Sequence, residues 1–250
     1  GDLARVGAAL ATERDLVALL RLVLGQARRL TNADAGSLYL VEPADADRPD
    51  GARVLRFMLT QNDTLPDLAL GEFTIPVDHA SLAGYAAAEA EVLAIADVYR
   101  PDATRDFRVN SSFDERFGYR TKSVLVVPVK TLKREVVGVL QLINRKRDAG
   151  ARLDSAEAVA REVLEFDRRC VELVRGLAAQ AAVAIENSRL YESIERLFEG
   201  FVTASATAIE SRDPATSGHS ARVATMTVGL AEALERGGVG AWRGTRFTRD

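Results

Sequence analysis

The sequence predicts an α+β fold: a six-stranded antiparallel sheet flanked by helices and followed by a long C-terminal helix. Apolar residues first recur with a helical period, then gather in short runs typical of strands, and return to a helical period from Ser155. The stretch Phe166–Arg212 contains no proline, which allows one long helix. Helix, strands, helix, strands and long helix in this order favour an antiparallel sheet between helices.

The first predicted element is a helix over residues 13–30. Its apolar residues Leu16, Leu20 and Val23 fall on one face. Six apolar runs bounded by polar or Gly- and Pro-containing segments are predicted as strands. They are Gly36–Val41, Val54–Leu59, Phe73–Val77, Val92–Val98, Val124–Val129 and Val136–Ile143. The proline in the third run favours a sheet edge, and residues 81–89 are predicted as a short helix.

A long polar excursion separates the fourth and fifth predicted strands. Residues 99–122 contain few apolar side chains and are rich in aspartate, asparagine and arginine. Segments of this length without regular structure are uncommon in compact domains. The excursion is therefore predicted to be either a functional loop or a disordered one.

The long C-terminal helix carries a seam of regularly spaced residues. Eight positions alternate spacings of four and three, and seven of them are apolar: Val183, Asn187, Leu190, Ile194, Leu197, Phe201, Ala204 and Ala208. This spacing predicts a coiled coil with the parallel helix of a second copy, in which Asn187 would fix the register. The alternative is a helix that packs back on its own domain.

Composition argues against several classes of function. The net charge is −3 and no long basic run occurs, which disfavours binding to nucleic acid through its phosphates. No apolar stretch of about 18 residues predicts a membrane span, and no secretory signal is visible. The lone Cys170 cannot form an internal disulfide, so we expect a reducing, cytoplasmic location. Because the first residue is Gly1, we expect the sequence to begin inside a longer protein.

Six short segments together resemble a GAF domain, of the type found in cyclic-nucleotide phosphodiesterases and many bacterial sensors. They occur in the family's order and spacing within residues 34–191. The segments are Ile75-Pro76-Val77-Asp78, Leu82-Ala83-Gly84-Tyr85, Ile95-Ala96-Asp97-Val98-Tyr99, Gly118-Tyr119-Arg120-Thr121-Lys122-Ser123, Val137-Gly138-Val139-Leu140-Gln141-Leu142-Ile143-Asn144-Arg145 and Ala184-Ile185-Glu186-Asn187-Ser188-Arg189-Leu190-Tyr191. The resemblance implies a small-molecule pocket on one face of the sheet, lidded by the polar excursion.

The same resemblance implies which residues would bind a ligand such as a cyclic nucleotide. The positions that match those of nucleotide-binding relatives are Ser37, Leu82, Ala83, Asn110, Asp114, Thr121 and Gln141. Hydroxyl and amide groups offer donors and acceptors to a purine base and a ribose, and N–H groups at a helix start meet a phosphate well. The alternative is that these side chains only satisfy neighbouring backbone groups or face solvent.

One stretch departs from the cyclic-nucleotide subset of the family. That subset carries an Asn-Lys pair and, downstream, a Phe and an Asp-Glu pair. Here Asn144 is followed by Arg145. Phe166 is present, but Cys170 and Val171 stand where the Asp-Glu pair would fall. A domain without a ligand therefore stays an alternative, and Cys170 is predicted to be a small core residue rather than a reactive thiol.

A second, shorter resemblance covers residues 208–223. They resemble the opening of an HD-GYP or related HD phosphohydrolase domain, in which the histidine that matches His219 is a metal ligand. That family uses a divalent metal of the Fe or Mn type, whose bound hydroxide attacks a phosphodiester. The sequence contains no following His-Asp pair and no Gly-Tyr-Pro signature. No cofactor is therefore expected in this chain, and the metal at His219 is implied only for a complete HD domain.

These observations predict four segments. Residues 1–12 are a lead, 13–191 a GAF-like sensor domain, 192–212 a coiled-coil connector, and 213–250 the truncated start of an HD-type phosphohydrolase domain. The predicted function is a small-molecule sensor that dimerises through the connector and controls a metal-dependent phosphodiesterase acting on a cyclic dinucleotide. The alternative is a ligand-free scaffold that dimerises the same output domain. An enzyme within this chain itself is disfavoured, because every catalytic constellation in it is incomplete.

Overall fold

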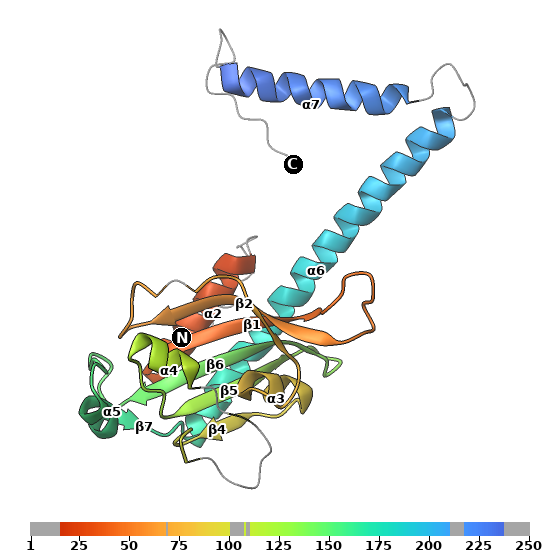
Figure 1. The fold of residues 1–250 in the computed structure, drawn as a ribbon. Coiled ribbons are helices and arrows are strands. Elements are labelled where there is room, and N and C mark those ends of the chain that lie inside the picture. Colours follow the sequence, from red (N-terminus) through yellow and green to blue (C-terminus); the bar gives the residue numbers. More distant parts are fainter. Residues whose placement is uncertain (1–15, 69, 101–107, 109–110, 211–217, 238–250) are drawn as a thin grey trace. The chain divides into compact units, whose positions relative to one another are not determined.

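The computed structural model describes residues 16–68, 70–100, 108, 111–210 and 218–237. The chain divides into two compact units, Gly1–Arg189 and Leu190–Asp250. Figure 1 shows that the first unit is a sheet with helices on both faces. The sequence predicts this α+β architecture.

The sheet has six antiparallel strands in the order β3-β2-β1-β6-β5-β4, and a short seventh strand pairs with β6. The strands are β1 (Ala33–Pro43), β2 (Arg53–Asn62), β3 (Thr74–Pro76), β4 (Leu93–Ile95), β5 (Val124–Lys130), β6 (Val136–Lys146) and β7 (Val163–Leu164). The six predicted strands are confirmed, and β3 lies at an edge as its proline predicts. The two-residue β7 was not predicted, because so short a strand has no period.

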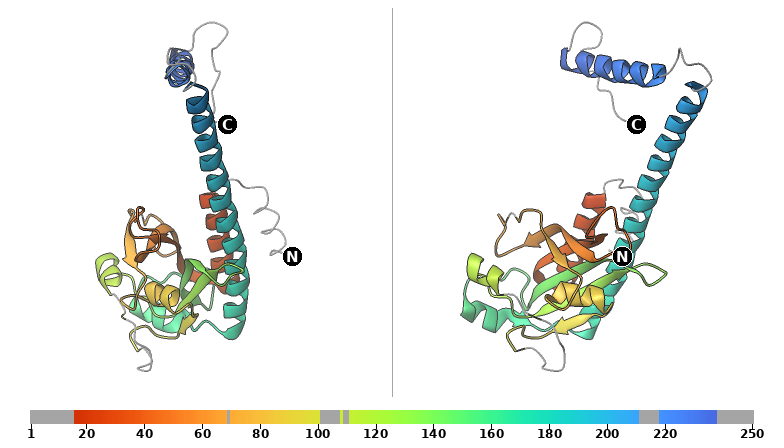
Figure 2. Two further views of the ribbon diagram at one scale, coloured as in Figure 1. Left: turned by 90° about the vertical axis from the view of Figure 1, so that its right-hand side faces the viewer. Right: turned by 45° about the vertical axis from the view of Figure 1, so that its right-hand side comes forward.

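Helix α2 (Leu16–Thr31) and the beginning of α6 (Arg168–Glu210) pack on one face of the sheet (Figures 1 and 2). Their apolar faces meet the inward side chains of β1, β5 and β6 in the larger of the two main cores. A Cβ on Gly36 would lie 2.8 Å from Leu24 Cδ1, so glycine lets α2 approach β1 this closely. Cys170 lies in this core and is buried, as predicted.

Helix α3 (Leu82–Ala88) packs on the opposite face of the sheet and α4 (Ser112–Phe117) lies on the same side (Figure 1). The second core joins the small side chains of α3 to apolar residues of β1, β2, β5 and β6. The polar excursion predicted over residues 99–122 contains α4. The short helix α5 (Ala156–Glu162) precedes β7.

The prediction of helix from Ser155 onward is wrong at residues 163–167. There the chain forms β7, and a new helix starts at Arg168. The side chain of Asp167 accepts a 2.9 Å hydrogen bond from the N–H of Cys170, which caps the first turn of α6. That N–H holds the pKa of the Asp167 carboxyl below its usual value.

Arg189 is the last residue of the first unit, and it attaches α6 to the sheet. Its Nη2 donates a 2.8 Å hydrogen bond to the carbonyl of Val41 in β1. In the second unit, the seam residues Leu190, Ile194 and Leu197 are 59%, 53% and 74% exposed. The second unit also contains α7 (His219–Gly237). None of the described helices is both long and apolar enough to cross a membrane.

Candidate ligand-binding cavity

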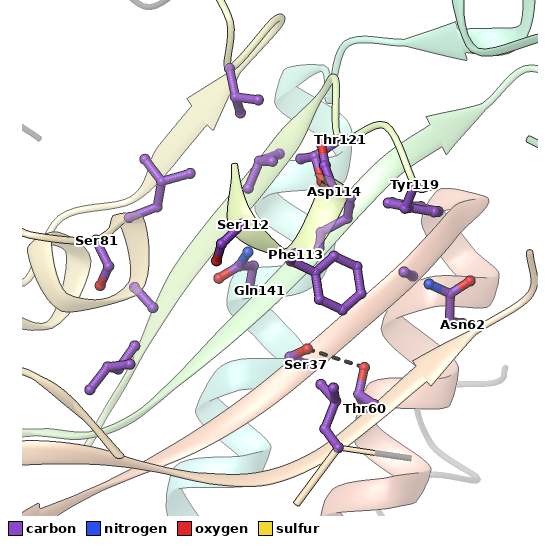
Figure 3. A pocket seen from close by; sticks show the side chains of 18 of the residues that line it. Ser37, Thr60, Asn62, Ser81, Ser112, Phe113, Asp114, Tyr119, Thr121 and Gln141 are labelled. Carbon is purple, nitrogen blue, oxygen red and sulfur yellow. Dashed lines mark hydrogen bonds between the residues drawn. The ribbon is translucent and has the colours of Figure 1, made fainter. Parts of the chain in front are cut away.

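A cavity of about 310 Å³ lies between the sheet and the side of the domain that carries α3 and α4 (Figure 3). Its floor comes from β1, β2 and β6, and its walls come from α3, α4 and the segments that flank α4. Apolar and aromatic side chains line it together with a few hydroxyl and amide groups. A cavity of this size and lining is typical of small-molecule sites.

The floor contains a polar row that runs across three strands. Successive side chains of a strand point to opposite faces, so alternate residues of each strand reach the cavity. Ser37 of β1 lies opposite Thr60 of β2 and, on its other side, opposite Gln141 of β6. All three line the cavity.

The hydroxyl groups of this row form a directed chain of hydrogen bonds. Ser37 donates to Thr60 Oγ1 at 3.2 Å, and Thr60 donates to the carbonyl of Gly36 at 2.9 Å. Because both hydroxyl hydrogens are used, Ser37 offers only oxygen lone pairs to a ligand. Within the described part of the chain, no hydrogen bond is found for the Gln141 amide, which leaves its donors and its acceptor to the cavity.

The start of α3 forms one wall of the cavity. Ser81 is the N-cap, with extended backbone, and its side chain accepts a 3.0 Å hydrogen bond from the N–H of Gly84. Leu82 and Ala83 follow, are buried, and line the cavity. Their N–H groups belong to the first turn, so they have no acceptor within the helix.

The carboxylate of Asp114 holds α4 over the cavity. It accepts hydrogen bonds from the Tyr99 hydroxyl at 2.6 Å, and from the N–H and hydroxyl of Thr121 at 2.6 and 2.8 Å. Burial and the bond to Asp114 raise the pKa of Tyr99 to about 12. The Arg120 guanidinium lies 4.7 Å from the centre of the Tyr99 ring. Asp114 thus ties Tyr99, which precedes α4, and Thr121, which follows it, to the helix.

Aromatic rings complete the cavity on the lid side. Figure 3 shows the Phe113 ring projecting from α4 over the floor, between Gln141 and Asn62. The rings of Phe113 and Tyr119 meet edge to face, with their centroids 6.1 Å apart. A flat ligand between Phe113 and the floor would therefore have an aromatic face to stack on.

A buried polar network supports the Tyr119 wall from behind. The Tyr119 hydroxyl donates to Asp34 Oδ2 at 2.8 Å and accepts from Asn144 Nδ2 at 3.1 Å. Asp34 also pairs with Lys146 Nζ at 3.2 Å, and both are buried. Burial, reinforced by the Asp34 charge, raises the pKa of Tyr119 well above its usual value. Asn144 further accepts from the N–H of Lys122 at 2.7 Å, which fixes the chain where it returns from the lid.

The stretch that departs from the cyclic-nucleotide subset has its own ion pair. Arg145 Nη1 lies 2.8 Å from Asp167 Oδ2, the carboxylate that directly follows Phe166. Cys170 packs in the core instead of presenting a charge, and burial raises the pKa of its thiol. The anchoring of β6 to the start of α6 thus uses Asp167 rather than the positions of Cys170 and Val171.

Six of the seven predicted ligand residues surround this one cavity: Ser37, Leu82, Ala83, Asp114, Thr121 and Gln141. Asn110 lies outside the described residues. Sequence reasoning missed Thr60, Asn62, Phe113 and Tyr119, which also line the cavity. Thr60 and Asn62 lie beyond the last apolar residue of the predicted second strand, so the apolar period gave no signal for them.

Metal chemistry finds no support in the described residues. No group of three or more His, Cys, Asp or Glu side chains suited to a metal occurs among them. α7 begins at His219, but the side chain of His219 lies outside the description. The described donors therefore do not fit a catalytic metal. The described cavity lining contains no histidine and no cysteine.

Comparison with known proteins matches the GAF domain family to residues 15–185. Curated relatives include the cGMP-specific 3′,5′-cyclic phosphodiesterases of Drosophila ananassae and Drosophila melanogaster. They are 28% and 27% identical over 186 residues, which cover 73% of this chain. The chain spans only 14% and 15% of the length of these relatives.

Solved structures share the fold. Residues 122 to 287 of a methyl-accepting chemotaxis protein match with a TM-score of 0.54 and 22% identity, covering 74% of this chain and 98% of that one. The GAF domain of a phosphoenolpyruvate-protein phosphotransferase from Coxiella burnetii matches with a TM-score of 0.54 and 20% identity, covering 76% and 94%. With the family match extending over more than half of its residues, the chain belongs to the GAF domain family.

Proposed function

We propose that the first unit is a regulatory sensor whose cavity binds a small heteroaromatic molecule of the cyclic-nucleotide class. The observation that carries this proposal is the hollow of about 310 Å³ with a polar floor under an aromatic ring. A core that had no ligand to accommodate would gain stability by closing such a space.

The chemistry of the cavity suits a purine nucleotide. Phe113 offers a stacking face, and the Gln141 amide offers a donor and an acceptor to a base edge. The N–H groups of Leu82 and Ala83 would face the phosphate. The named relatives are cGMP-specific phosphodiesterases, which supports a cyclic nucleotide as the first probe.

Signalling from the cavity would run through α6. The exposed apolar residues Leu190, Ile194, Leu197 and Phe201 keep the heptad spacing of a two-stranded coil, and in water such a stripe favours burial against the same stripe of a second copy. The proposed assembly is therefore a homodimer through the connector helix. A ligand regulates such a dimer only if it binds two arrangements of the connector unequally.

The proposed output is an HD-type metal-dependent phosphodiesterase that acts on a cyclic dinucleotide. Its support is the resemblance of residues 208–223 to the opening of that domain, in which His219 would be one metal ligand. The alternative is a ligand-free GAF scaffold that only dimerises the same output domain.

Titration calorimetry with 3′,5′-cyclic AMP and 3′,5′-cyclic GMP tests the sensor proposal. We expect saturable binding of at least one of them to the wild-type chain and its loss in Gln141→Leu, which removes the polar groups at nearly constant volume. Gln61→Leu is the matched control, because Gln61 contacts Arg28 and the carbonyl of Arg21 on α2. Absence of binding to the folded wild type would favour the scaffold.

A further inference from the structure

Asn62 lies at the end of β2 in the cavity wall, and its side chain is held in one orientation. Its Oδ1 accepts a 2.8 Å hydrogen bond from the backbone N–H of Leu65. Figure 3 shows its nitrogen on the side of Phe113 and its oxygen turned away. An asparagine amide has one acceptor oxygen and two N–H donors. Asn62 therefore presents its N–H donors to the cavity.

The floor beside Asn62 presents a hydrogen-bond acceptor, whereas Asn62 presents donors. Ser37 gives its hydrogen to Thr60, and Thr60 gives its own to Gly36, so the Ser37 oxygen faces the cavity as an acceptor. Asn62 lies opposite Ala35, two residues before Ser37 on the same side of β1. A ligand that fills the cavity thus meets a donor at one point and an acceptor at another.

We propose that Asn62 is a specificity-determining residue that donates a hydrogen bond to an acceptor atom of the ligand. The acceptor is a carbonyl oxygen or an unprotonated ring nitrogen, and a ligand with an N–H group at this point is rejected, because two donors would face each other unpaired. This inference rests on the proposed function, in which the cavity binds a heteroaromatic molecule.

The test is titration calorimetry of the whole chain and two variants with 3′,5′-cyclic AMP and 3′,5′-cyclic GMP. Asn62→Asp is nearly isosteric, keeps an oxygen for the Leu65 N–H, and replaces the donor by an acceptor. Gln61→Glu is the matched control. It adds the same charge at the next residue, whose side chain contacts Arg28 and Arg21 on the opposite side of the sheet.

We expect Asn62→Asp to bind the nucleotide preferred by the wild type at least about tenfold more weakly, and Gln61→Glu to change binding less than about twofold. Unchanged or tighter binding by Asn62→Asp, or an equal loss in both variants, would overturn the role of Asn62 and leave the sensor proposal standing. If the wild type binds neither nucleotide, both proposals fail.

A measurement on the wild type alone can still overturn the inference if Asn62→Asp does not fold. Analogues of the bound nucleotide are titrated in which each acceptor atom of the base is in turn replaced by C–H. We expect one of them to bind at least about tenfold more weakly. Equal binding of all the analogues would show that no donor of the protein reads the base edge, and would overturn the inference.

Discussion

Asp114 accepts both the backbone N–H and the hydroxyl of Thr121, so one carboxylate fixes the chain on the C-terminal side of the lid. In the wild type, the two carboxylate oxygens of Asp114 accept hydrogen bonds from Tyr99 and Thr121. Asp114→Asn leaves a single acceptor oxygen for these donors. We expect α4 to open more often, with faster amide hydrogen exchange over residues 111–118, and the pKa of Tyr99 to fall from about 12. Phenol absorbance against pH measures the second effect. Glu115→Gln, on the same helix and exposed, controls for charge in the exchange measurement, and its Oε1 can still accept from the Ser111 hydroxyl. Equal exchange in the two variants would contradict the role of Asp114 in holding α4.

Removing the Tyr119 hydroxyl is expected to destabilise the domain. Tyr119→Phe takes one donor from the buried Asp34 carboxylate and one acceptor from Asn144. Leaving buried polar groups without partners costs about 1–3 kcal/mol of unfolding free energy. Urea denaturation followed by circular dichroism measures it. Tyr191→Phe, whose side chain is exposed, should be neutral, and similar midpoints for both variants would refute the prediction.

The domain is expected to lose stability in alkali through Tyr39. Burial raises the pKa of Tyr39 to about 12. Because this folded-state value lies above the unfolded value of about 10, the contribution is complete below pH 10 and is lost as the pH rises toward 12. By pH 11 the loss is about 1 kcal/mol. Tyr99 and Tyr119, whose pKa values are also raised, add losses of their own in both proteins. Between pH 9 and pH 11, urea unfolding should therefore show a loss about 1 kcal/mol larger in the wild type than in Tyr39→Phe. An identical pH dependence in the two proteins would rule Tyr39 out as the cause.

Charges in the seam of α6 are expected to abolish the proposed dimer. Ile194→Glu combined with Leu197→Glu places four like charges in the seam of a dimer, where apolar side chains would otherwise be buried. Sedimentation velocity should show a dimer for the wild type and a monomer for the variant. Leu132→Glu changes a side chain that is 96% exposed at the β5–β6 turn and should leave the dimer intact. A wild type that sediments as a monomer would exclude this assembly.

Sequence patterns predict the central strands of this domain well because β1, β5 and much of β6 are buried on both faces. Val124–Val129 and Val136–Leu140 are buried without a break, and unbroken apolar runs of this kind are typical of strands covered by helices on both sides. The break before α6 was missed because residues 163–167 contain apolar residues that also fit a helix. Pairing of β7 with β6 and the Asp167 cap decide the structure there.

The cavity could be predicted only in part, because a floor made by three strands depends on register. The second predicted strand stopped at Leu59, whereas β2 continues through Asn62 since its pairing with β1 continues to Ala35. Cross-strand neighbours such as Ser37 and Gln141 lie about a hundred positions apart in the sequence. Phe113 belongs to the polar excursion, where its ring gave no periodic signal.

The bond between Arg189 and Val41 has a mechanical consequence. β1 carries Ser37 in the cavity and, four residues later, Val41, whose carbonyl accepts the hydrogen bond from Arg189. A ligand that displaced β1 at Ser37 would therefore also displace the acceptor of the Arg189 hydrogen bond at the sheet end of α6. A helix amplifies a small tilt at its root into a larger sideways excursion at its far end, as a lever does. Arg189→Ala removes this hydrogen bond. We expect the variant still to bind a ligand in the cavity, while binding no longer changes the position of α6.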